Sequence, residues 1–373
     1  MKPRPASLPE LRHQVDRTDR AITTAIGRRL RLAHSIGRTK RDAGISLRDF
    51  ATEDRVLRRW RTQLRAVGVT EARSEALARW MIEESLRVQE SIPGRARKRR
   101  PPGERIGVVG GSGGMGRWLV EFLTDSAHEV RILDPRASPA DPRTMSSLEE
   151  MLGECQMVAF ATPIRATPAL LEQAIDSRPE AVLFDVLSVK APIVPIVEEG
   201  CRRGCRISSA HPMFGPSART LSGRNLLLVS CGVREADAAV RALFTPTALT
   251  ITEVPLARHD RLIAESLGLA HAVNLLFLSA LASDPMTPLD LATAASTTFH
   301  RQSSLAAAVA REGPELYLDI QSLNPHSGEV YSELRAALDR LVDIVERKDL
   351  GEFRALLESG RSKLETGPEP MRA

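Results

Sequence analysis

The 373 residues include 52 basic and 47 acidic side chains, which give a formal net charge of +5, and only 4% are aromatic. A chain of this length exceeds one compact core, so we expect two or three domains. No apolar run approaches the ~20 residues that a membrane span needs; the four irregularly spaced cysteines argue against a disulfide framework or a zinc site, which favours a reduced, cytoplasmic protein without a bound metal.

The first ninety residues show helical periodicity and no strand signal. Residues 11–36 predict one long amphipathic helix, and two shorter runs on either side of Gly68 predict two more helices. The apolar positions are Leu11, Val15, Ile22, Ile26, Leu30, Ala33 and Ile36 in the first run, Val56, Leu57, Trp60, Leu64 and Val67 in the second, and Leu77, Trp80, Met81 and Leu86 in the third. We therefore expect an all-α module over residues 1–92.

Residues 95–100, RARKRR, form a dense basic block that is followed by two prolines. Such a block is found in nucleic-acid-binding proteins. Acidic residues occur along the whole chain, however, and the block lies between two patterned regions. We interpret residues 93–103 as a linker and expect neither nucleic acid nor a membrane as a partner. Positive charge gathered in pockets would suit a small anionic substrate.

Beyond the linker, apolar strands alternate with helices. The strand signals are RIGVVG (105–110), EVRILD (129–134), QMVAFATP (156–163), AVLFDVLS (181–188), CRISSAHP (205–212) and NLLLVS (225–230). This alternation predicts a Rossmann-type α/β domain with a doubly wound parallel sheet over residues 104–254. Helical spacing alone returns at 259–283, 289–311 and 328–365. It predicts an all-α domain over residues 255–373, which we expect to cap the active site and to pair two subunits into a homodimer.

The segment RIGVVGGSGGMG leads from the first strand into a glycine-rich turn. The spacing of Gly111, Gly113 and Gly116 predicts a tight turn, room for a pyrophosphate against bare backbone, and close packing of a helix on the strand. Asp134 ends the next apolar run, where it would accept hydrogen bonds from the adenosine ribose hydroxyls. Arg136 could instead pair with a 2′-phosphate, but we expect NAD rather than NADP.

His211 is the candidate catalytic residue of this domain, because it lies just after the fifth strand in SSAHPMFGPS. Ligands of such sheets bind at the carboxyl ends of the strands. A histidine there could accept the proton of a substrate hydroxyl as hydride leaves the same carbon. The alternative is a histidine that only hydrogen-bonds loop backbone.

The motifs GGSGGMG, ATPI, FDVLSVK and HPMFGP resemble the prephenate dehydrogenase family over most of residues 104–350. The resemblance implies that His211 hydrogen-bonds the C4 hydroxyl of prephenate while hydride passes from C4 to the nicotinamide. The ring carboxylate then leaves as CO2, and the product is 4-hydroxyphenylpyruvate. In STTFHRQSS, Arg301 is expected to hold a substrate carboxylate, with His300 as the alternative.

The same resemblance implies further residues around substrate and cofactor. They are His271 and Ser188 for the substrate, Thr162, Pro163 and Met115 for the cofactor, and Lys190 beside the nicotinamide.

The contexts LPELRHQVDRTD, GRRLRLAHSIGRTK and IEESLRVQE resemble the all-helical chorismate mutase family over residues 8–90. The Claisen rearrangement needs no nucleophile and no general acid or base. It needs a grip on a compact conformer and donors at the breaking ether oxygen. The resemblance therefore implies two arginines on the carboxylates, two donors at the ether oxygen, and acids at the group on C4. These residues are Arg29 with Arg12 of the partner subunit, Lys40 with Gln89, and Asp49 with Glu53; Ser85 completes the substrate site.

One position departs from the mutase pattern. Thr52 stands where the family usually has an arginine just before the glutamate. Two like charges about 4 Å apart cost on the order of 1 kcal/mol in water and about 4 kcal/mol at an effective dielectric near 20, so losing that arginine would ease binding of a C4 ammonium. The substrate is then either chorismate, for tyrosine biosynthesis, or 4-amino-4-deoxychorismate, which would lead to 4-aminophenylpyruvate.

The mutase product is the dehydrogenase substrate in either case, which predicts one bifunctional enzyme. Two alternatives are a non-catalytic metabolite sensor and a lone dehydrogenase whose helical domain is regulatory.

Overall fold

The computed structural model describes residues 7–43, 47, 49–90, 104–177, 179–218, 220–283, 285–311 and 313–365. The linker expected at residues 93–103 lies outside these ranges. The chain forms two compact units. One comprises Met1–Ser188 with Pro192–Ala257, and the other comprises Val189–Ala191 with Arg258–Ala373.

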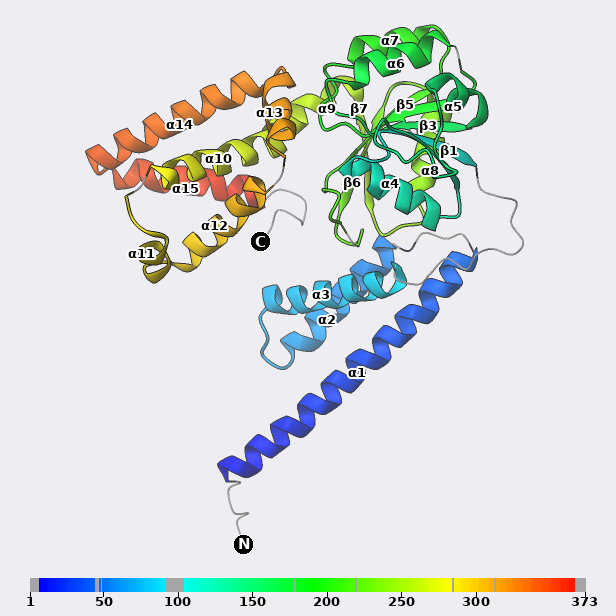
Figure 1. The fold of residues 1–373 in the computed structure, drawn as a ribbon. Coiled ribbons are helices and arrows are strands. Elements are labelled where there is room, and N and C mark those ends of the chain that lie inside the picture. Colours follow the sequence, from blue (N-terminus) through cyan, green and yellow to red (C-terminus); the bar gives the residue numbers. More distant parts are fainter. Residues whose placement is uncertain are drawn as a thin grey trace. The chain divides into compact units, whose positions relative to one another are not determined.

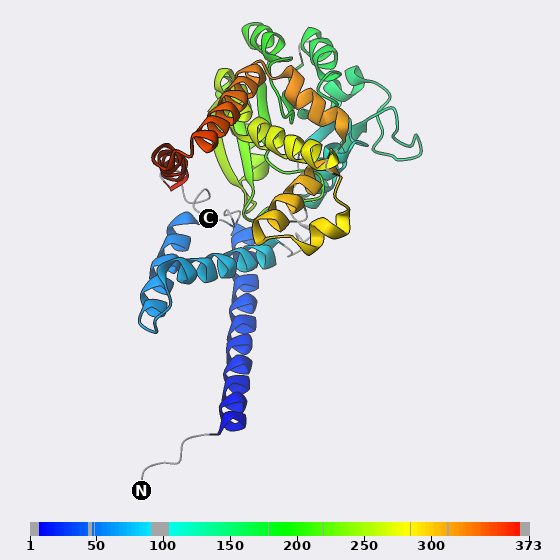
Figure 2. The same cartoon turned by 90° about the vertical axis from the view of Figure 1, so that its left-hand side faces the viewer.

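Three helices form the N-terminal module, as the periodicity predicts: α1 (Leu8–Ala43), α2 (Phe50–Arg65) and α3 (Glu71–Glu90). Asp49 caps α2 by accepting a hydrogen bond from the Thr52 N–H. Gly68 has a φ of +85° and allows the turn toward α3. Figures 1 and 2 show α3 beside the C-terminal part of α1 only, and α2 packs on α3, so Leu11 and Val15 in the N-terminal part of α1 stay exposed.

The central domain contains a seven-stranded sheet of order β2-β1-β3-β4-β5-β6-β7. Its strands are β1 (Arg105–Val109), β2 (Glu129–Leu133), β3 (Met157–Phe160), β4 (Val182–Asp185), β5 (Ile207–Pro212), β6 (Asn225–Ser230) and β7 (Thr250–Pro255). The structure confirms the six predicted strands. The sequence pattern misses β7, because this edge strand buries only Val254 and has no apolar run.

One pair of strands departs from the predicted parallel arrangement. β5 and β6 run antiparallel, with His211 opposite Leu227, whereas the other neighbouring strands are parallel. The chain turns back between these two strands, and the described residues 213–218 and 220–224 contain no helix of the kind that a parallel crossover needs. The segment that follows His211 therefore leads directly into β6.

Five helices accompany the sheet: α4 (Gly114–Asp125), α5 (Leu148–Glu154), α6 (Thr167–Asp176), α7 (Val194–Arg202) and α8 (Arg234–Phe244). The inner strands are buried on both faces, which is why their apolar residues are continuous rather than alternating. Ile106, Val108, Phe184 and Phe244 lie in one core cluster.

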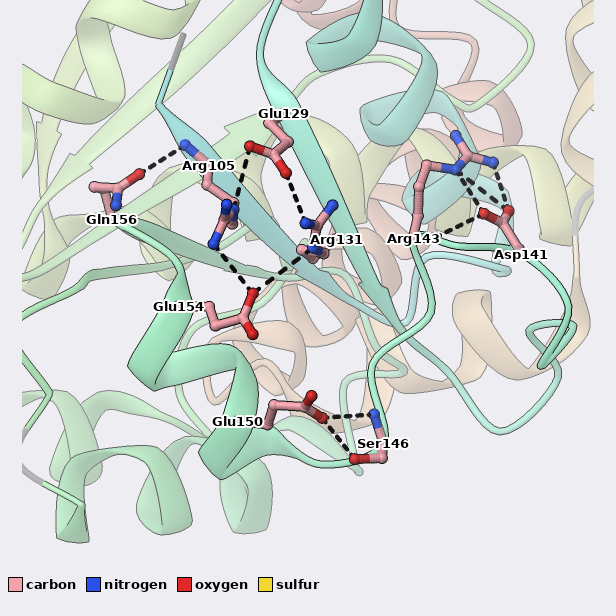
Figure 3. Close-up of polar contacts among 9 residues, drawn as sticks. All are labelled: Arg105, Glu129, Arg131, Asp141, Arg143, Ser146, Glu150, Glu154 and Gln156. Carbon is pink, nitrogen blue, oxygen red and sulfur yellow. Dashed lines mark hydrogen bonds and ion pairs between the residues drawn. The ribbon is translucent and has the colours of Figure 1, made fainter. Parts of the chain in front are cut away.

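A charged network joins the amino-terminal part of β1 and β2 (Figure 3). Arg105 Nε lies 3.3 Å and Arg131 Nη2 lies 2.6 Å from Glu129, and Arg105 Nη1 lies 3.1 Å from Glu154. Parallel sheets bind ligands at the opposite, carboxyl ends of their strands. We therefore interpret this network as structural.

The C-terminal unit is helical, as predicted. Its elements are α9 (Leu256–Ile263), the π-helix η1 (Ala264–Gly268), α10 (Leu269–Ala282), α11 (Pro288–Thr293), α12 (Thr297–Ala310), α13 (Pro314–Leu323), α14 (Ser327–Arg347) and α15 (Leu350–Glu365). The predicted run 289–311 is two helices, because Ser296 caps a new helix by accepting the Phe299 N–H. The sequence pattern does not predict α13.

One expectation about apolar runs needs correction. Leu256–Ala282 is long and apolar enough to cross a membrane, judged by length and composition. Of the most apolar 18-residue stretch of this segment, 28% is buried in the structure. Core helices of soluble proteins pass the same test, so this single helix is weak evidence for a membrane span.

Candidate functional site

The glycine-rich turn has the backbone that the sequence predicts. A Cβ at Gly116 would lie 2.0 Å from the Gly110 carbonyl oxygen, and one at Gly111 would lie 2.8 Å from Ile132 Cγ2. Both contacts are too close for any side chain, so the α4 N-terminus packs against the turn as a dinucleotide site requires. Gly110 is a further required glycine, with a φ of +85°. The sequence signal for this requirement is the doublet of Gly110 and Gly111 at the end of the first predicted strand.

Asp134 lies directly after β2 and beside this turn. It accepts hydrogen bonds from the Ser112 N–H at 3.0 Å and the Arg136 N–H at 2.8 Å. Burial alone would raise the pKa of Asp134, but the hydrogen bonds from Arg136 and Ser112 outweigh burial and lower it. The carboxylate is therefore ionised and suited to accept ribose hydroxyls. Its Arg136 neighbour is 70% exposed at the side chain.

The polar residues expected around the nicotinamide follow parallel strands. Thr162 and Pro163 come after β3, Ser188 comes after β4, and His211 lies at the end of β5. The carboxyl ends of parallel strands share one edge of the sheet, so these positions lie on the edge that carries the glycine-rich turn. His211 is only 3% exposed.

Asp260 is not among the residues that the sequence singles out, but the structure gives it a defined role within the C-terminal unit. Its carboxylate accepts the N–H groups of Lys190 at 2.8 Å and Ala191 at 2.6 Å, and it lies 2.7 Å from His259 Nδ1. Burial would raise the pKa of Asp260, yet the contacts with His259 and the two N–H groups lower it. Asp260 thus ties α9 to the segment after Ser188. Lys190 itself is fully buried.

His271 and Arg301 lie on α10 and α12 of the C-terminal unit. His271 is 9% exposed, and its ring lies 4.3 Å from that of Tyr317. Burial lowers the pKa of His271 to about 4, so the ring is neutral at physiological pH. Its Nδ1 has no hydrogen-bond partner among the described residues. Arg301 and His300 are both exposed, so the choice of carboxylate anchor between them stays a prediction.

In the N-terminal module, α1 and α3 bring together three of the expected mutase residues. Arg29 Nη1 donates to the Met81 carbonyl at 2.8 Å and to the Ser85 hydroxyl. Gln89 is 7% exposed and donates to the Ser85 carbonyl at 3.2 Å, which leaves one amide hydrogen for a substrate. Burial lowers the pKa of Arg29. This fixed, partly desolvated guanidinium is suited to bind a carboxylate.

Two further mutase residues lie near each other. Lys40 Nζ donates to the Leu47 carbonyl at 2.7 Å, and the lysine charge helps to lower the pKa of Asp49, after the hydrogen bonds from Thr52. Glu53 follows on α2 and is half-buried. Arg12 lies apart from these residues on the exposed part of α1, which is compatible with its expected action in a partner subunit.

The structure adds a residue to the charge argument from Thr52. Thr52 donates its hydroxyl to Asp49 Oδ2 at 2.8 Å, and Arg55 Nη2 donates to the Thr52 hydroxyl at 2.7 Å. A guanidinium from the next helical turn therefore lies beside the position where the family's arginine is missing. Sequence reasoning did not consider Arg55, although its three-residue spacing from Thr52 puts both on one helix face.

Among the described residues, no group of three or more His, Cys, Asp or Glu side chains is placed to hold a metal ion.

Comparisons with known proteins match both parts of the chain. The chorismate mutase type II family matches residues 11–90, and the nucleotide-binding domain of prephenate dehydrogenase matches residues 136–229. The 4-amino-4-deoxyprephenate dehydrogenase of Streptomyces pristinaespiralis is 31% identical over 274 residues, 70% of this chain and 91% of the relative. The T-protein of Enterobacter agglomerans is 25% identical over 317 residues, 84% of this chain and 82% of the relative.

Solved structures confirm the fold of the dehydrogenase part. Prephenate dehydrogenase from A. aeolicus, in complex with hydroxyphenyl propionate and NAD+, has a TM-score of 0.58 at 17% identity and covers 71% of this chain and 98% of its own. Synechocystis arogenate dehydrogenase has a TM-score of 0.55 at 21% identity, and the match covers 70% of this chain and 99% of the arogenate dehydrogenase. The expected nicotinamide dinucleotide cofactor is confirmed by the family match. The chain belongs to the prephenate dehydrogenase family and is an enzyme that carries a chorismate mutase type II domain ahead of its dehydrogenase part.

Proposed function

We propose that this chain rearranges chorismate to prephenate and then oxidises and decarboxylates prephenate to 4-hydroxyphenylpyruvate with NAD. One observation carries the proposal: a chorismate mutase domain and a prephenate dehydrogenase domain occur in one chain. The product of the first reaction is the substrate of the second. Two pockets in one polypeptide would thus act on successive forms of the same dianionic ring compound.

In the mutase step, the protein holds the substrate in a reactive conformer. Arg29, fixed by Met81 and Ser85, binds one carboxylate, and Arg12 of the partner subunit binds the other. Lys40 and Gln89 donate to the ether oxygen, where negative charge develops as the bond breaks. Asp49 and Glu53 accept from the group on C4.

In the dehydrogenase step, His211 accepts the proton of the C4 hydroxyl. A dinucleotide held there would supply the hydride acceptor for C4, while the C1 carboxylate leaves as CO2 and its bonding electrons enter the ring, which becomes aromatic. The glycine-rich turn and Asp134 hold the dinucleotide. His271, Ser188 and the Arg301 guanidinium hold the substrate, whose carboxylate pairs with the arginine.

A second candidate has an amino group on C4 instead of the hydroxyl. Thr52 replaces the family's arginine, and a relative that acts as a 4-amino-4-deoxyprephenate dehydrogenase is 31% identical. The Arg55 guanidinium at Thr52 favours the hydroxyl substrate, since a cation near Asp49 opposes a substrate ammonium. The hydroxyl compound is therefore our first candidate.

One assay tests the function and separates the two candidates. The purified chain receives chorismate or 4-amino-4-deoxychorismate together with NAD or NADP, and reduced cofactor is followed by absorbance. We expect a higher kcat/KM for chorismate with NAD. A higher value for the amino compound would favour the second candidate. If neither compound is rearranged and no cofactor is reduced, the proposed function is refuted, and a non-catalytic metabolite sensor becomes the better interpretation.

We also propose a homodimer. Apolar side chains are exposed on α1 and along the α14–α15 hairpin: Leu8, Leu11, Val15 and Ile22 on α1, and Leu338, Leu341, Val342, Val345, Leu350, Phe353 and Leu357 on the hairpin. Exposed apolar surfaces of this kind are typical of subunit interfaces. Light scattering measures the mass. Mixing Arg12→Ala and Arg29→Ala subunits should restore part of the mutase rate, because one site of a mixed dimer would hold both arginines.

A further inference from the structure

The end of β5 that carries His211 extends beyond the register that β5 shares with β4. The β4–β5 register ends with Asp185 opposite Ser209, so His211 and Pro212 extend beyond the paired part of β4. On the other side they pair with Leu227 and Leu226 of β6. Residues 213–218 follow this end of β5 directly, so contacts that hold them can affect the position of His211.

Trp118 of α4 holds this connecting segment by two contacts. Its indole Nε1 donates to the Ala218 carbonyl at 3.2 Å. Its ring meets Phe214 edge-on, with centroids 5.1 Å apart and planes at 67°. Phe214 and Ala218 are 9% and 8% exposed and Trp118 is half-buried, so both contacts are partly shielded from water.

The helix that carries Trp118 is itself well anchored. Trp118 stacks on Phe122 with centroids 5.3 Å apart, and Phe122 stacks on Phe244 of the core at 5.3 Å. At the start of α4, a Cβ on Gly114 would lie 3.2 Å from Pro216 Cγ, so helix and segment are in close contact there too. The helix whose N-terminus would face the pyrophosphate of a bound dinucleotide is thus packed against the segment that follows His211.

We propose that Trp118 is a positioning residue: it holds His211 at the distance from the nicotinamide ring that the oxidation needs. This proposal rests on the proposed role of His211 and deepens it. A small displacement of a proton acceptor in a hydride-transfer site costs rate without loss of binding. Trp118 acts through the segment 213–218 and touches neither substrate nor cofactor in this role.

Trp118→Phe tests the proposal, because phenylalanine keeps an aromatic ring but has no N–H for the Ala218 carbonyl. We expect kcat of the oxidation to fall about tenfold, while KM for NAD, the mutase rate and the unfolding midpoint stay near the parent values. Gly114→Ala adds a Cβ in close contact with Pro216 Cγ, so it should shift the same segment and lower kcat of the oxidation as well. Trp80→Phe, the same exchange at a half-exposed tryptophan of α3, is the matched control and should leave the oxidation unchanged.

A double variant separates positioning from mere stability. If Trp118 acts through His211, then Trp118→Phe should lower the residual oxidation rate of His211→Asn by much less than tenfold, because the two effects are not independent. An unchanged kcat in Trp118→Phe, a full tenfold effect in the His211→Asn background, or an equal loss of mutase and dehydrogenase rates would each overturn the proposal. Absence of oxidation already in the parent chain would instead refute the proposed function.

Discussion

The Arg136 guanidinium donates to both carboxylate oxygens of Asp134, at 3.3 and 3.4 Å, next to the glycine-rich turn. The carboxylate side chain is 2% exposed, whereas the arginine side chain is 70% exposed. The acid is therefore a fixed part of the site, and the arginine is its movable partner. We expect this pair to decide between NAD and NADP.

Asp134→Ser should lower kcat/KM for NAD ten- to a hundredfold, since charge-assisted hydrogen bonds of about 1.5–3 kcal/mol to the ribose would be lost. The same variant should use NADP relatively better, because Arg136 becomes available for a 2′-phosphate. The matched control is Asp141→Ser. Asp141 makes the same two-residue pair with Arg143, which lowers its pKa to about 2, but it has no predicted cofactor contact (Figure 3). Equal effects of both variants would contradict the assignment of Asp134.

Gly116→Ala should raise KM for NAD about tenfold or more, because its Cβ would lie 2.0 Å from the Gly110 carbonyl oxygen and the turn would have to open. The mutase rate should not change. Gly153→Ala provides the control, because no heavy atom lies within 4 Å of a Cβ at this position in α5. It should raise stability by about 0.5–1 kcal/mol, as measured by denaturant unfolding.

His211→Ala should abolish oxidation and leave the rearrangement of chorismate intact. Gln89→Ala should do the reverse: chorismate consumption falls at least a hundredfold, because a donor to the developing charge is lost, while added prephenate is still oxidised. Chorismate absorbance and reduced-cofactor absorbance report the two steps separately. Loss of both activities in either variant, with an unchanged unfolding curve, would refute the model of two separate sites.

Thr52→Arg should lower the mutase kcat/KM for 4-amino-4-deoxychorismate more than that for chorismate. A second guanidinium beside Asp49 would repel a C4 ammonium by about 1–4 kcal/mol, whereas a hydroxyl carries no charge. The control is Thr62→Arg, which adds the same charge at an exposed position of the same helix. An equal change for both substrates would show that position 52 does not face the group on C4.

The lowered pKa of His271 predicts a pH dependence of stability. Its folded pKa is about 4, against an ordinary value of 6.5, so between these values the unfolded chain binds more protons at this residue. The contribution of neutral His271 to the free energy of unfolding is therefore complete above pH 6.5 and is lost as the pH falls toward 4. His271→Asn should therefore lose less stability than the parent over this range in thermal unfolding. His300→Asn, an exposed histidine of the same unit, should follow the parent.

Much of the architecture could be predicted, because local spacing determines it. Helical periodicity located α1 to α3, and continuous apolar runs located β1 to β6, since buried elements need apolar side chains at fixed intervals. The glycine spacing predicted the dinucleotide turn for the same reason: a Cβ at Gly116 cannot be accommodated. The two family resemblances supplied the candidate chemistry.

The tertiary structure decided the contacts between distant segments. The antiparallel return of β6, the Trp118 bond to Ala218, and the Arg29 contact with Ser85 join residues that no local pattern relates. The position of the Arg55 guanidinium at Thr52 depends on a side-chain conformation, which spacing permits but does not impose. Such contacts arise from how elements pack, because many packings satisfy the same apolar pattern while only one brings these particular groups together.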